Sequence, residues 1–151
     1  MKEDLPIEAF KRGDEMGILN LLSLADLPTE DLTIDKLKHF LVARDENDVV
    51  IGAIGVELCH DIGLLRSLVV APSYRRKGLG VQLVHALQSY AQSNAVKTLF
   101  LLTITSRDFF KRLGYQVTQR SLVPVPIAKT EEFKNICPVS AVCLFKNLES
   151  S

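Results

Sequence analysis

The stretch LLRSLVVAPSYRRKGLG, residues 64–80, contains the signals that decide the expected fold. Its first seven residues are nearly all apolar, which is typical of a central strand buried on both faces. Ala71 and Pro72 end this strand, and a turn of basic residues and glycine follows. The clearest helical pattern of the chain then runs from Leu79 to Ser93, and its apolar positions are Leu79, Leu83, Val84, Leu87 and Ala91. We expect a strand, a basic turn and a helix in succession.

A helix that begins directly after such a turn can bind an anion. The first backbone N–H groups of a helix have no helical acceptor and carry a partial positive charge. Glycine lets a backbone approach a ligand closely, so a pyrophosphate would satisfy several donors of the Arg75–Gly80 turn at once. The bare pattern R-x-x-G-x-G is weak, because glycine pairs at helix starts are common structural turns. It has neither the P-loop spacing nor the dinucleotide fingerprint.

The distribution of charge favours an anionic ligand near this turn. The chain has 151 residues with 18 basic and 18 acidic side chains, so its formal net charge is zero. Residues 1–61 carry 14 acids and 6 bases, whereas residues 62–107 carry six bases and no acid. The competing interpretation is that the middle segment lacks acids because it is buried. Zero net charge argues against a general nucleic-acid binder or a polybasic membrane binder.

Length and composition indicate one soluble globular domain, with 47% hydrophobic and 24% charged residues. No apolar stretch approaches the ~18 residues of a membrane span, and the start MKEDLPIEAF is not typical of a secretion signal. Cys59, Cys137 and Cys143 lack CxxC spacing, so we expect no disulfide framework and no metal site. A reducing cytoplasm is therefore the expected compartment.

Apolar periodicity predicts the remaining elements. The expected strands are 7–10, 40–44, 49–58, 64–70, 98–103, 115–120 and 140–146. The expected helices are one capped by Asp14 with a stripe of Met16, Leu19, Leu22 and Leu24, then 34–39, 79–93, a short helix ending at Gly114, and a turn near 129–135 after the breakers Pro124 and Pro126. Gly52 and Gly55 predict close packing or a bulge. A hairpin meander followed by alternating strands and helices indicates an α/β or α+β mixed sheet.

Residues 64–80 resemble motif A of the GNAT superfamily of acetyl-coenzyme-A-dependent N-acetyltransferases, whose signature Q/R-x-x-G-x-G/A follows a strand. The resemblance covers nearly the whole chain and includes NLLSLADLPTEDL (20–32), FLVAR (40–44), IGAIGVEL (51–58), LLTIT (101–105), FFKRLGY (109–115) and CPVSAVCLFK (137–146). Within the superfamily the chain is similar to the arsenic-resistance type of N-acetyltransferase. The resemblance implies a single domain over 1–151, with a mixed sheet of about seven strands, splayed at the fourth and fifth and flanked by helices.

The resemblance also implies how acetyl coenzyme A would bind. Backbone groups of Leu68, Val69 and Val70 would pair with the pantetheine amides in the cleft opened by the splayed strands. A backbone N–H near Val70 would polarise the thioester carbonyl. Amides of the turn would hold the pyrophosphate. The implied cofactor-binding residues are Leu68, Val69, Val70, Arg75, Arg76, Lys77, Gly78, Leu79, Gly80, Thr103, Phe110 and Arg112.

Motif B departs from the pattern N-x-x-A-x-x-x-Y-x-K-x-G-F. Its matching positions here are Thr103, Ser106, Phe110, Arg112, Gly114 and Tyr115. In many relatives the Tyr protonates the leaving thiolate, but Phe110 has no hydroxyl. Either water or another residue supplies the proton, or the thiolate leaves unprotonated. The carboxylate base that some relatives carry on the motif A strand falls here at Leu64, so it is missing too.

Glu57 and Arg66 are the candidate catalytic residues. Glu57 is the only acid in the strand expected to pair with 64–70, and Arg66 lies two residues from Leu64, on the same strand face. One interpretation is a buried structural ion pair. The other is that Arg66 binds a substrate carboxylate in fork geometry while Glu57 orients or deprotonates the amine through a water. The sequence leaves both open.

The expected activity is transfer of an acetyl group from acetyl coenzyme A to the primary amine of a small, amino-acid-like acceptor, linked to arsenical or xenobiotic resistance. Attack would be direct, because no cysteine falls within motif A or B. Alternatives are a protein or peptide N-acetyltransferase and a non-catalytic acyl-CoA sensor. We expect no nucleic-acid or membrane partner, and a homodimer remains open. His85 is expected on a helix surface, and Tyr115 and the cysteines are expected to pack.

Overall fold

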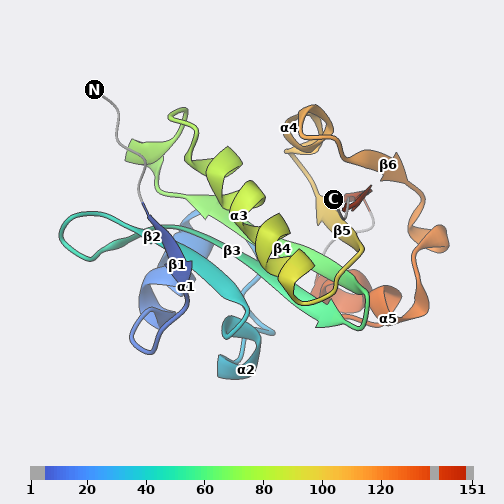
Figure 1. Ribbon diagram of the computed structural model, residues 1–151, viewed down its shortest axis with the longest axis horizontal. Helices are drawn as coiled ribbons and strands as arrows, with labels where there is room; N and C mark the ends of the chain where they lie inside the picture. The colour runs from blue at the N-terminus through green and yellow to red at the C-terminus, as the bar shows by residue number, and fades with distance from the viewer. Residues whose placement is uncertain (1–5, 137–139, 149–151) are drawn as a thin grey trace. The chain divides into compact units, whose positions relative to one another are not determined.

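The computed structural model describes residues 6–136 and 140–148 (Figure 1). Within these residues seven strands form one mixed sheet in the order β1-β2-β3-β4-β5-β7-β6. The strands are β1 (Ile7–Ala9), β2 (Phe40–Arg44), β3 (Val50–Cys59), β4 (Ile62–Val70), β5 (Thr98–Thr103), β6 (Gln116–Thr118) and β7 (Val142–Asn147). The helices are α1 (Glu15–Leu24), α2 (Ile34–Leu37), α3 (Leu79–Ser93), α4 (Arg107–Arg112) and α5 (Val125–Ala128), with short helical turns η1 (Pro72–Tyr74), η2 (Arg120–Leu122) and η3 (Glu132–Ile136). The predicted fold class, a mixed sheet flanked by helices, is confirmed.

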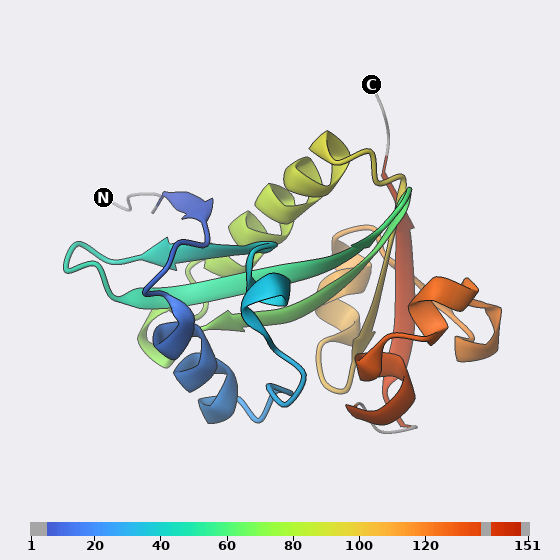
Figure 2. The same ribbon diagram turned by 90° about the horizontal axis from the view of Figure 1, so that it is seen from below.

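The chain divides into two compact units that share β3, β4 and α3. The first unit comprises Met1–Val56 and Ser67–Ser89, and the second comprises Glu57–Arg66 and Tyr90–Ser151. In the first unit β1, β2 and β3 form an antiparallel meander. Figure 2 shows α1 and α2 on one face of these strands and α3 on the other. The first unit therefore buries apolar side chains on both faces of its strands.

Close packing in the first unit depends on two glycines of β3. A Cβ atom at Gly55 would overlap the ring of Phe40, and one at Gly52 would lie 3.1 Å from Leu83 Cδ1 of α3. The predicted role of these glycines is thus confirmed. The core on the α1 face consists of Ile18, Leu21, Leu22, Leu37, Phe40, Val42, Val50, Ala53 and Val69.

The predicted apolar stripe of the first helix is confirmed at Leu22 and wrong at Met16 and Leu24. Met16 and Leu24 are 66% and 76% exposed, whereas the buried side chains of α1 are Ile18, Leu21 and Leu22. At 100° per residue, these three buried positions fall within about 100° of one another on the helix surface. The helix is apolar on most sides, so its packing partners decide which face is buried.

Asp14 occupies the N-cap position of α1, but its side chain makes no capping hydrogen bond. Asp14 Oδ2 instead accepts from the Lys11 N–H at 2.9 Å and from Arg44 Nη2 at 2.5 Å. Arg44 is buried at the end of β2 and also contacts Glu8 and Asp48. A buried guanidinium needs carboxylate partners, and Asp14 bonds to Arg44 instead of to the helix end, which explains why the predicted cap does not form.

In the second unit β5 pairs with β7 and β7 pairs with β6, both antiparallel. β4 runs parallel to β5 through the pairs Ile62–Thr98, Gly63–Leu99 and Leu64–Phe100. Both strands are fully described, and beyond Leu64 and Phe100 they share no registered pair. This register agrees with the predicted splay of the fourth and fifth strands. A core of Leu64, Phe100, Val123, Ile127, Phe133 and Cys143 lies in this unit.

Pro124 and Pro126 precede a helical turn, η3, as predicted, but they also begin a short helix, α5, that was not predicted. Pro124 is the N-cap of α5, and Pro126 lies in its first turn. Proline is tolerated there because the N–H groups of a first turn have no helical acceptor to lose. The helical turn predicted near 129–135 is found as η3, and α5 is an additional short helix before it. The strand predicted at 115–120 is shorter and covers Gln116–Thr118.

Candidate functional site

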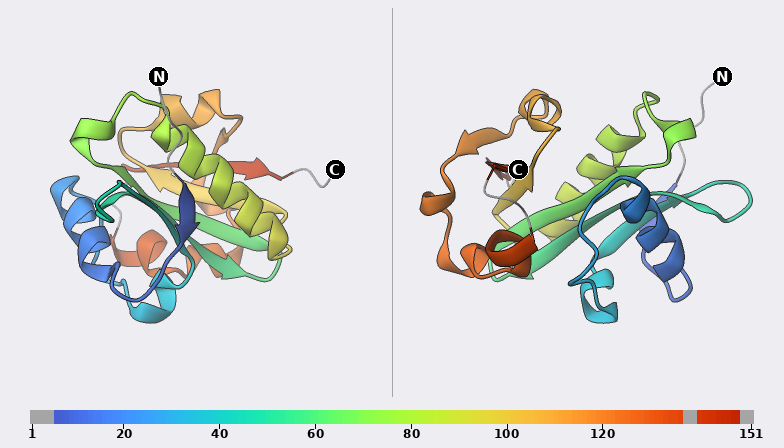
Figure 3. Two further views of the ribbon diagram at one scale, coloured as in Figure 1. Left: turned by 60° about the vertical axis from the view of Figure 1, so that its left-hand side comes forward. Right: turned by 180° about the vertical axis from the view of Figure 1, so that it is seen from behind.

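The connection from β4 to α3 has the backbone geometry of an anion site. Figure 3 traces it in green from β4 through η1 into α3. Arg76 and Gly78 have left-handed backbone conformations, with φ of 64° and 86°. The Gln82 N–H donates to the Gly78 carbonyl at 3.1 Å, so the N–H groups of Leu79 to Val81 precede the first one with a helical acceptor. These donors lie at the positive end of a 15-residue helix.

Cationic side chains surround this turn. Arg75, Arg76 and Lys77 are all exposed. Arg75 Nε donates to the Val70 carbonyl at 3.1 Å, and Lys77 Nζ lies 5.7 Å from the centre of the Tyr74 ring. Both contacts keep part of each side chain beside the turn and leave its charge in solvent. The turn and its cations therefore place positive charge at the N-terminus of α3, where a phosphate could bind.

Ser67 lies within β4, four residues before Ala71. Its φ is 62°, a left-handed conformation that is unusual for a residue other than glycine. Leu68, Val69 and Val70 follow it, and the Ala71 N–H then donates to the Ile51 carbonyl at 2.8 Å. No sequence signal predicted this irregularity, because serine has no particular preference for it.

The structure brings Glu57 and Arg66 together in the second unit. Arg66 Nη1 donates to Glu57 Oε2 at 2.7 Å. The Arg66 side chain is 0% exposed and that of Glu57 is 19% exposed. The pairing is the one that the structural interpretation predicts. The side chain of Glu57 is thus partly accessible to solvent, unlike that of Arg66.

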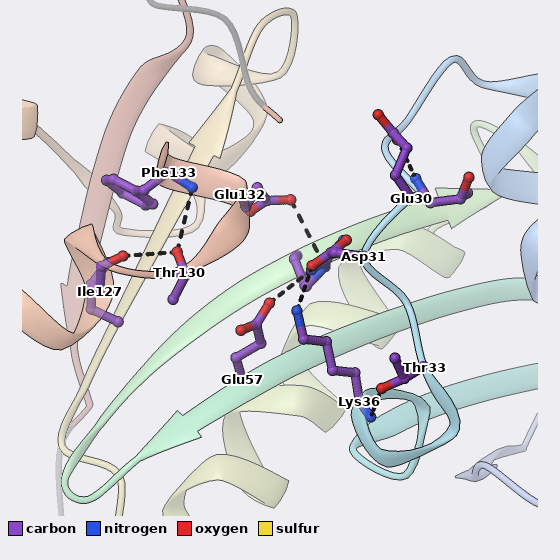
Figure 4. A network of polar contacts seen from close by, with 11 residues as sticks. Glu30, Asp31, Thr33, Lys36, Glu57, Ile127, Thr130, Glu132 and Phe133 are labelled. Atoms are coloured by element: carbon purple, nitrogen blue, oxygen red, sulfur yellow. Dashed lines mark hydrogen bonds and ion pairs between the residues drawn. The ribbon is translucent and has the colours of Figure 1, made fainter. Parts of the chain in front are cut away.

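Glu132, in η3, is a second carboxylate at Arg66 that sequence reasoning missed. Glu132 Oε1 lies 3.8 Å from Arg66 Nε, and its side chain is 5% exposed. Figure 4 shows Glu57 and Glu132 with their dashed interactions. Glu132 lies 66 positions after Arg66 in the chain, so only the tertiary structure could place them together. The one available signal was that an arginine within an apolar strand needs charged partners.

The two aromatic residues at the predicted motif B positions, Phe110 and Tyr115, are buried. Phe110 is 4% exposed, and its ring meets that of Tyr115 edge to face with centroids 5.4 Å apart. Burial raises the pKa of the Tyr115 hydroxyl well above its ordinary value. Thr103 Oγ1 accepts from the Ser106 N–H at 3.0 Å, and Arg112 is exposed. Packing of Tyr115 is as predicted.

The histidine and cysteine residues considered in the sequence lie at the following places in the structure. His85 is exposed on α3, as predicted. Cys143 is buried in the second unit, and burial raises the pKa of its thiol to about 11. Cys137 lies outside the described residues. Within residues 6–136 and 140–148, no group of three or more His, Cys, Asp and Glu side chains is placed to hold a metal ion. In the same part of the chain, the helices are too short or too polar to cross a membrane.

Comparison with known proteins gives consistent matches. A family model described as an acetyltransferase (GNAT) domain matches residues 36–117, just over half of the chain. An uncharacterized N-acetyltransferase of Chlorobaculum tepidum is 33% identical over 95 residues, which cover 62% of this chain and 60% of that protein. An amino-acid acetyltransferase of Pseudomonas fluorescens is 27% identical over 122 residues, which cover 80% of this chain and 27% of that protein. The chain thus spans less than two thirds of either relative.

The fold also matches solved structures. The N-acetylglutamate synthase of Neisseria gonorrhoeae, solved in complex with coenzyme A and N-acetyl-glutamate, superposes with a TM-score of 0.86 at 16% identity. The match covers 99% of this chain and 36% of that one. At this identity the similarity is one of fold alone.

Proposed function

The chain belongs to the GNAT acetyltransferase family, and from this premise we propose that it acetylates the primary amine of a small, amino-acid-like acceptor with acetyl coenzyme A. The amine nitrogen attacks the thioester carbonyl, the C–N bond forms and the C–S bond breaks. The nitrogen gives up one proton, and coenzyme A leaves as its thiolate or thiol. We propose that residues 1–151 form a single domain of this family.

The observation that carries the proposal is the connection from β4 to α3. Its left-handed residues Arg76 and Gly78 precede a helix whose first N–H groups lie beside three exposed cations. This arrangement suits a pyrophosphate, as the family resemblance implies for coenzyme A. Leu68 to Val70 would bind the pantetheine arm through their backbone groups. Thr103, Phe110 and Arg112 complete the proposed cofactor set.

For the chemical step we propose that Glu57 accepts the amine proton, directly or through a water. Its side chain is partly exposed, and the hydrogen bond to Arg66 fixes one of its oxygens. A backbone N–H near Val70 would stabilise the oxyanion. The buried Phe110 offers no proton, so the thiolate would leave unprotonated or be protonated by water. Arg66 would bind the acceptor carboxylate, and since its side chain has no exposed area, that requires a protein group to move away.

The test measures the free thiol of coenzyme A that is released from acetyl coenzyme A. The acceptors offered are the twenty standard amino acids and the corresponding amines without a carboxylate. The proposal expects release only when both substrates are present, with the acetylated amine found by mass spectrometry. Coenzyme A binding without transfer to any amine, including a basic peptide, would support the sensor alternative. Transfer to the peptide alone would support a protein acetyltransferase.

Glu57→Gln tests the proposed base. The variant should fold and bind acetyl coenzyme A normally, because the amide can still accept from Arg66. Its rate at neutral pH should fall by about 10²-fold or more, with the acid limb of the pH–rate profile lost. An unaltered pH profile would exclude Glu57 as the base.

Two narrower statements are also proposals. A cytoplasmic location rests on the cysteine pattern of the sequence, and the link to arsenical resistance rests on the family resemblance. The link predicts that an arsenic-containing amino acid is acetylated more efficiently than the ordinary amino acid of the same size. Equal acetylation efficiency for the two amino acids would exclude the link to arsenical resistance.

A further inference from the structure

We propose that Arg75 is a positioning residue for acetyl transfer, because its side chain holds the last peptide group of β4 in a fixed orientation. Arg75 would act through the backbone of Val70, and not only through its charge beside the cofactor phosphates. This inference rests on the proposed function, in which a backbone N–H near Val70 stabilises the oxyanion. It deepens that function by naming the group that fixes this part of the backbone.

The peptide group between Val70 and Ala71 is hydrogen-bonded at both of its polar atoms. Its N–H, on Ala71, donates to the Ile51 carbonyl of β3 at 2.8 Å. Its carbonyl, on Val70, accepts from Arg75 Nε at 3.1 Å. A trans peptide is planar, and its N–H and C=O point in opposite directions. The two hydrogen bonds therefore fix the plane of this peptide from both edges of the strand.

The hydrogen bond from Arg75 lies at the edge of β4 that faces away from β3. The Ala71 N–H points toward Ile51 of β3, so the Val70 carbonyl points to the opposite edge. Val70 is the last residue of β4, and in an extended strand the N–H and C=O of one residue lie at the same edge. The Val70 N–H, which we take as the oxyanion donor, is therefore at the edge that Arg75 holds. A peptide that tilts at the Val70 carbonyl would turn this N–H as well.

The short turn η1 places Arg75 close to this edge. The Tyr74 N–H donates to the Ala71 carbonyl at 2.9 Å, and the Arg75 N–H donates to the Pro72 carbonyl at 3.3 Å. These two bonds fold the chain back, so a residue five positions after Val70 can reach the Val70 carbonyl. The bond uses the single Nε donor, and the exposed side chain keeps its Nη donors in contact with solvent. One guanidinium can therefore hold the backbone and still attract a phosphate.

Three substitutions separate the hydrogen bond of Arg75 from its charge. Glutamine carries an N–H group on the atom that follows Cδ, as arginine does, so Arg75→Gln keeps a donor in the same place and removes the charge. Arg75→Lys keeps the charge and puts a methylene group where Nε lies. Arg75→Met removes both the donor and the charge. Of the three, Arg75→Gln is the one that can still hold the Val70 carbonyl from the same position.

The experiment measures a single turnover of acetyl transfer to the amine that the wild type acetylates fastest, with all acetyl coenzyme A bound to enzyme in excess. Arg75→Met and Arg75→Lys should each lower this rate by about tenfold, because the oxyanion donor is less well oriented. Arg75→Gln should recover most of the wild-type rate, although the lost charge should weaken its binding of coenzyme A. Calorimetric titration with coenzyme A measures that affinity separately.

Two further variants control for the loss of positive charge. Lys77→Met removes a cation of the same turn, whose ammonium lies 5.7 Å from the centre of the Tyr74 ring. It should weaken coenzyme A binding but lower the single-turnover rate less than Arg75→Met does. Arg12→Met replaces an exposed cation in the turn before α1 and should keep the wild-type rate and affinity. Because Arg75 is exposed, its variants should melt within about 2 °C of the wild type.

Three results would overturn the inference. An unchanged single-turnover rate in folded Arg75→Met, with lower affinity for coenzyme A, would show that Arg75 binds phosphate and does not position the backbone. Failure of Arg75→Gln to recover the rate, whether or not Arg75→Lys recovers it, would exclude the hydrogen bond to Val70 as the cause. A wild type that acetylates no amine of the panel would overturn the proposed function and this inference with it.

Discussion

Gly78 is the residue whose backbone most directly shapes the proposed phosphate site. Its φ of 86° lies in the left-handed region, where a β-branched side chain is strained. Gly78→Val should therefore shift the turn and weaken acetyl coenzyme A binding at least tenfold, or by ~1.4 kcal/mol. Calorimetric titration of the folded variant measures the effect.

Gly13→Val provides the matched control. Gly13 also has a left-handed φ, of 109°, but it precedes α1 and lies outside the turn. This variant should carry a similar backbone strain, of order 1–3 kcal/mol, and keep the wild-type affinity for the cofactor. Equal loss of affinity in both variants would mean that strain, not the anion site, weakens binding.

Phe110 tests whether the proposed acetyl transfer needs the general acid that the family resemblance implies at this position. Phe110→Tyr should retain acetyl transfer, because the rest of the proposed site is unchanged. The new hydroxyl enters a buried position against Tyr115, so the variant should lose about 1–3 kcal/mol of stability unless the hydroxyl finds a partner. Steady-state kinetics and a melting curve measure the two effects. An inactive but folded variant would place the leaving thiolate elsewhere.

At the scale of elements, the orientation of α1 gives a paired prediction. Ile18 is fully buried in the core of the first unit, whereas Met16 on the same helix is largely exposed. Ile18→Ala should lower the free energy of unfolding by about 2–5 kcal/mol, because it removes buried methyl groups and leaves a cavity. Met16→Ala should change it by less than about 0.5 kcal/mol. Urea denaturation of both variants measures the difference.

Elements with a strong local pattern could be predicted from sequence. The strands at 40–44 and 98–103 and the helix at 79–93 have the predicted bounds, because each apolar pattern is continuous and ends at a turn or polar residue. The face of α1 could not be predicted, since a helix with apolar residues on most sides leaves the choice to its packing partners. Prolines at 124 and 126 are compatible with both a loop and a first helical turn.

The candidate site likewise has residues that could be predicted from the sequence and residues that could not. The basic turn is contiguous in sequence, so its residues and its helix could be identified together. The Glu57–Arg66 contact could be anticipated because a short hairpin joins their strands. Glu132 comes from a distant segment, and Ser67 takes a conformation that its residue type does not favour. Both depend on tertiary packing, which no local pattern encodes.

At the scale of the whole molecule, two buried acidic groups connect stability to alkaline pH. Burial raises the pKa of the Cys143 thiol to about 11, against the opposing effect of the Arg120 cation, and it also raises the pKa of the Tyr115 hydroxyl. Unfolding returns the thiol to an ordinary value of about 8.5. Between these two values the unfolded chain binds fewer protons than the folded chain, so the free energy of unfolding falls as pH rises.

Cys143→Ala should separate this effect from packing. At pH 7 the variant should be less stable than the wild type, because it leaves a small cavity in the core of the second unit. Between pH 8.5 and pH 11 it should lose less stability, since one group contributes at most about 1.4 kcal/mol per pH unit to the slope. Cys59→Ala, at a partly exposed position, should keep the wild-type slope. Melting temperatures measured from pH 7 to pH 11 decide the matter: a Cys143→Ala slope as steep as that of the wild type would assign the alkaline loss to Tyr115 and other groups.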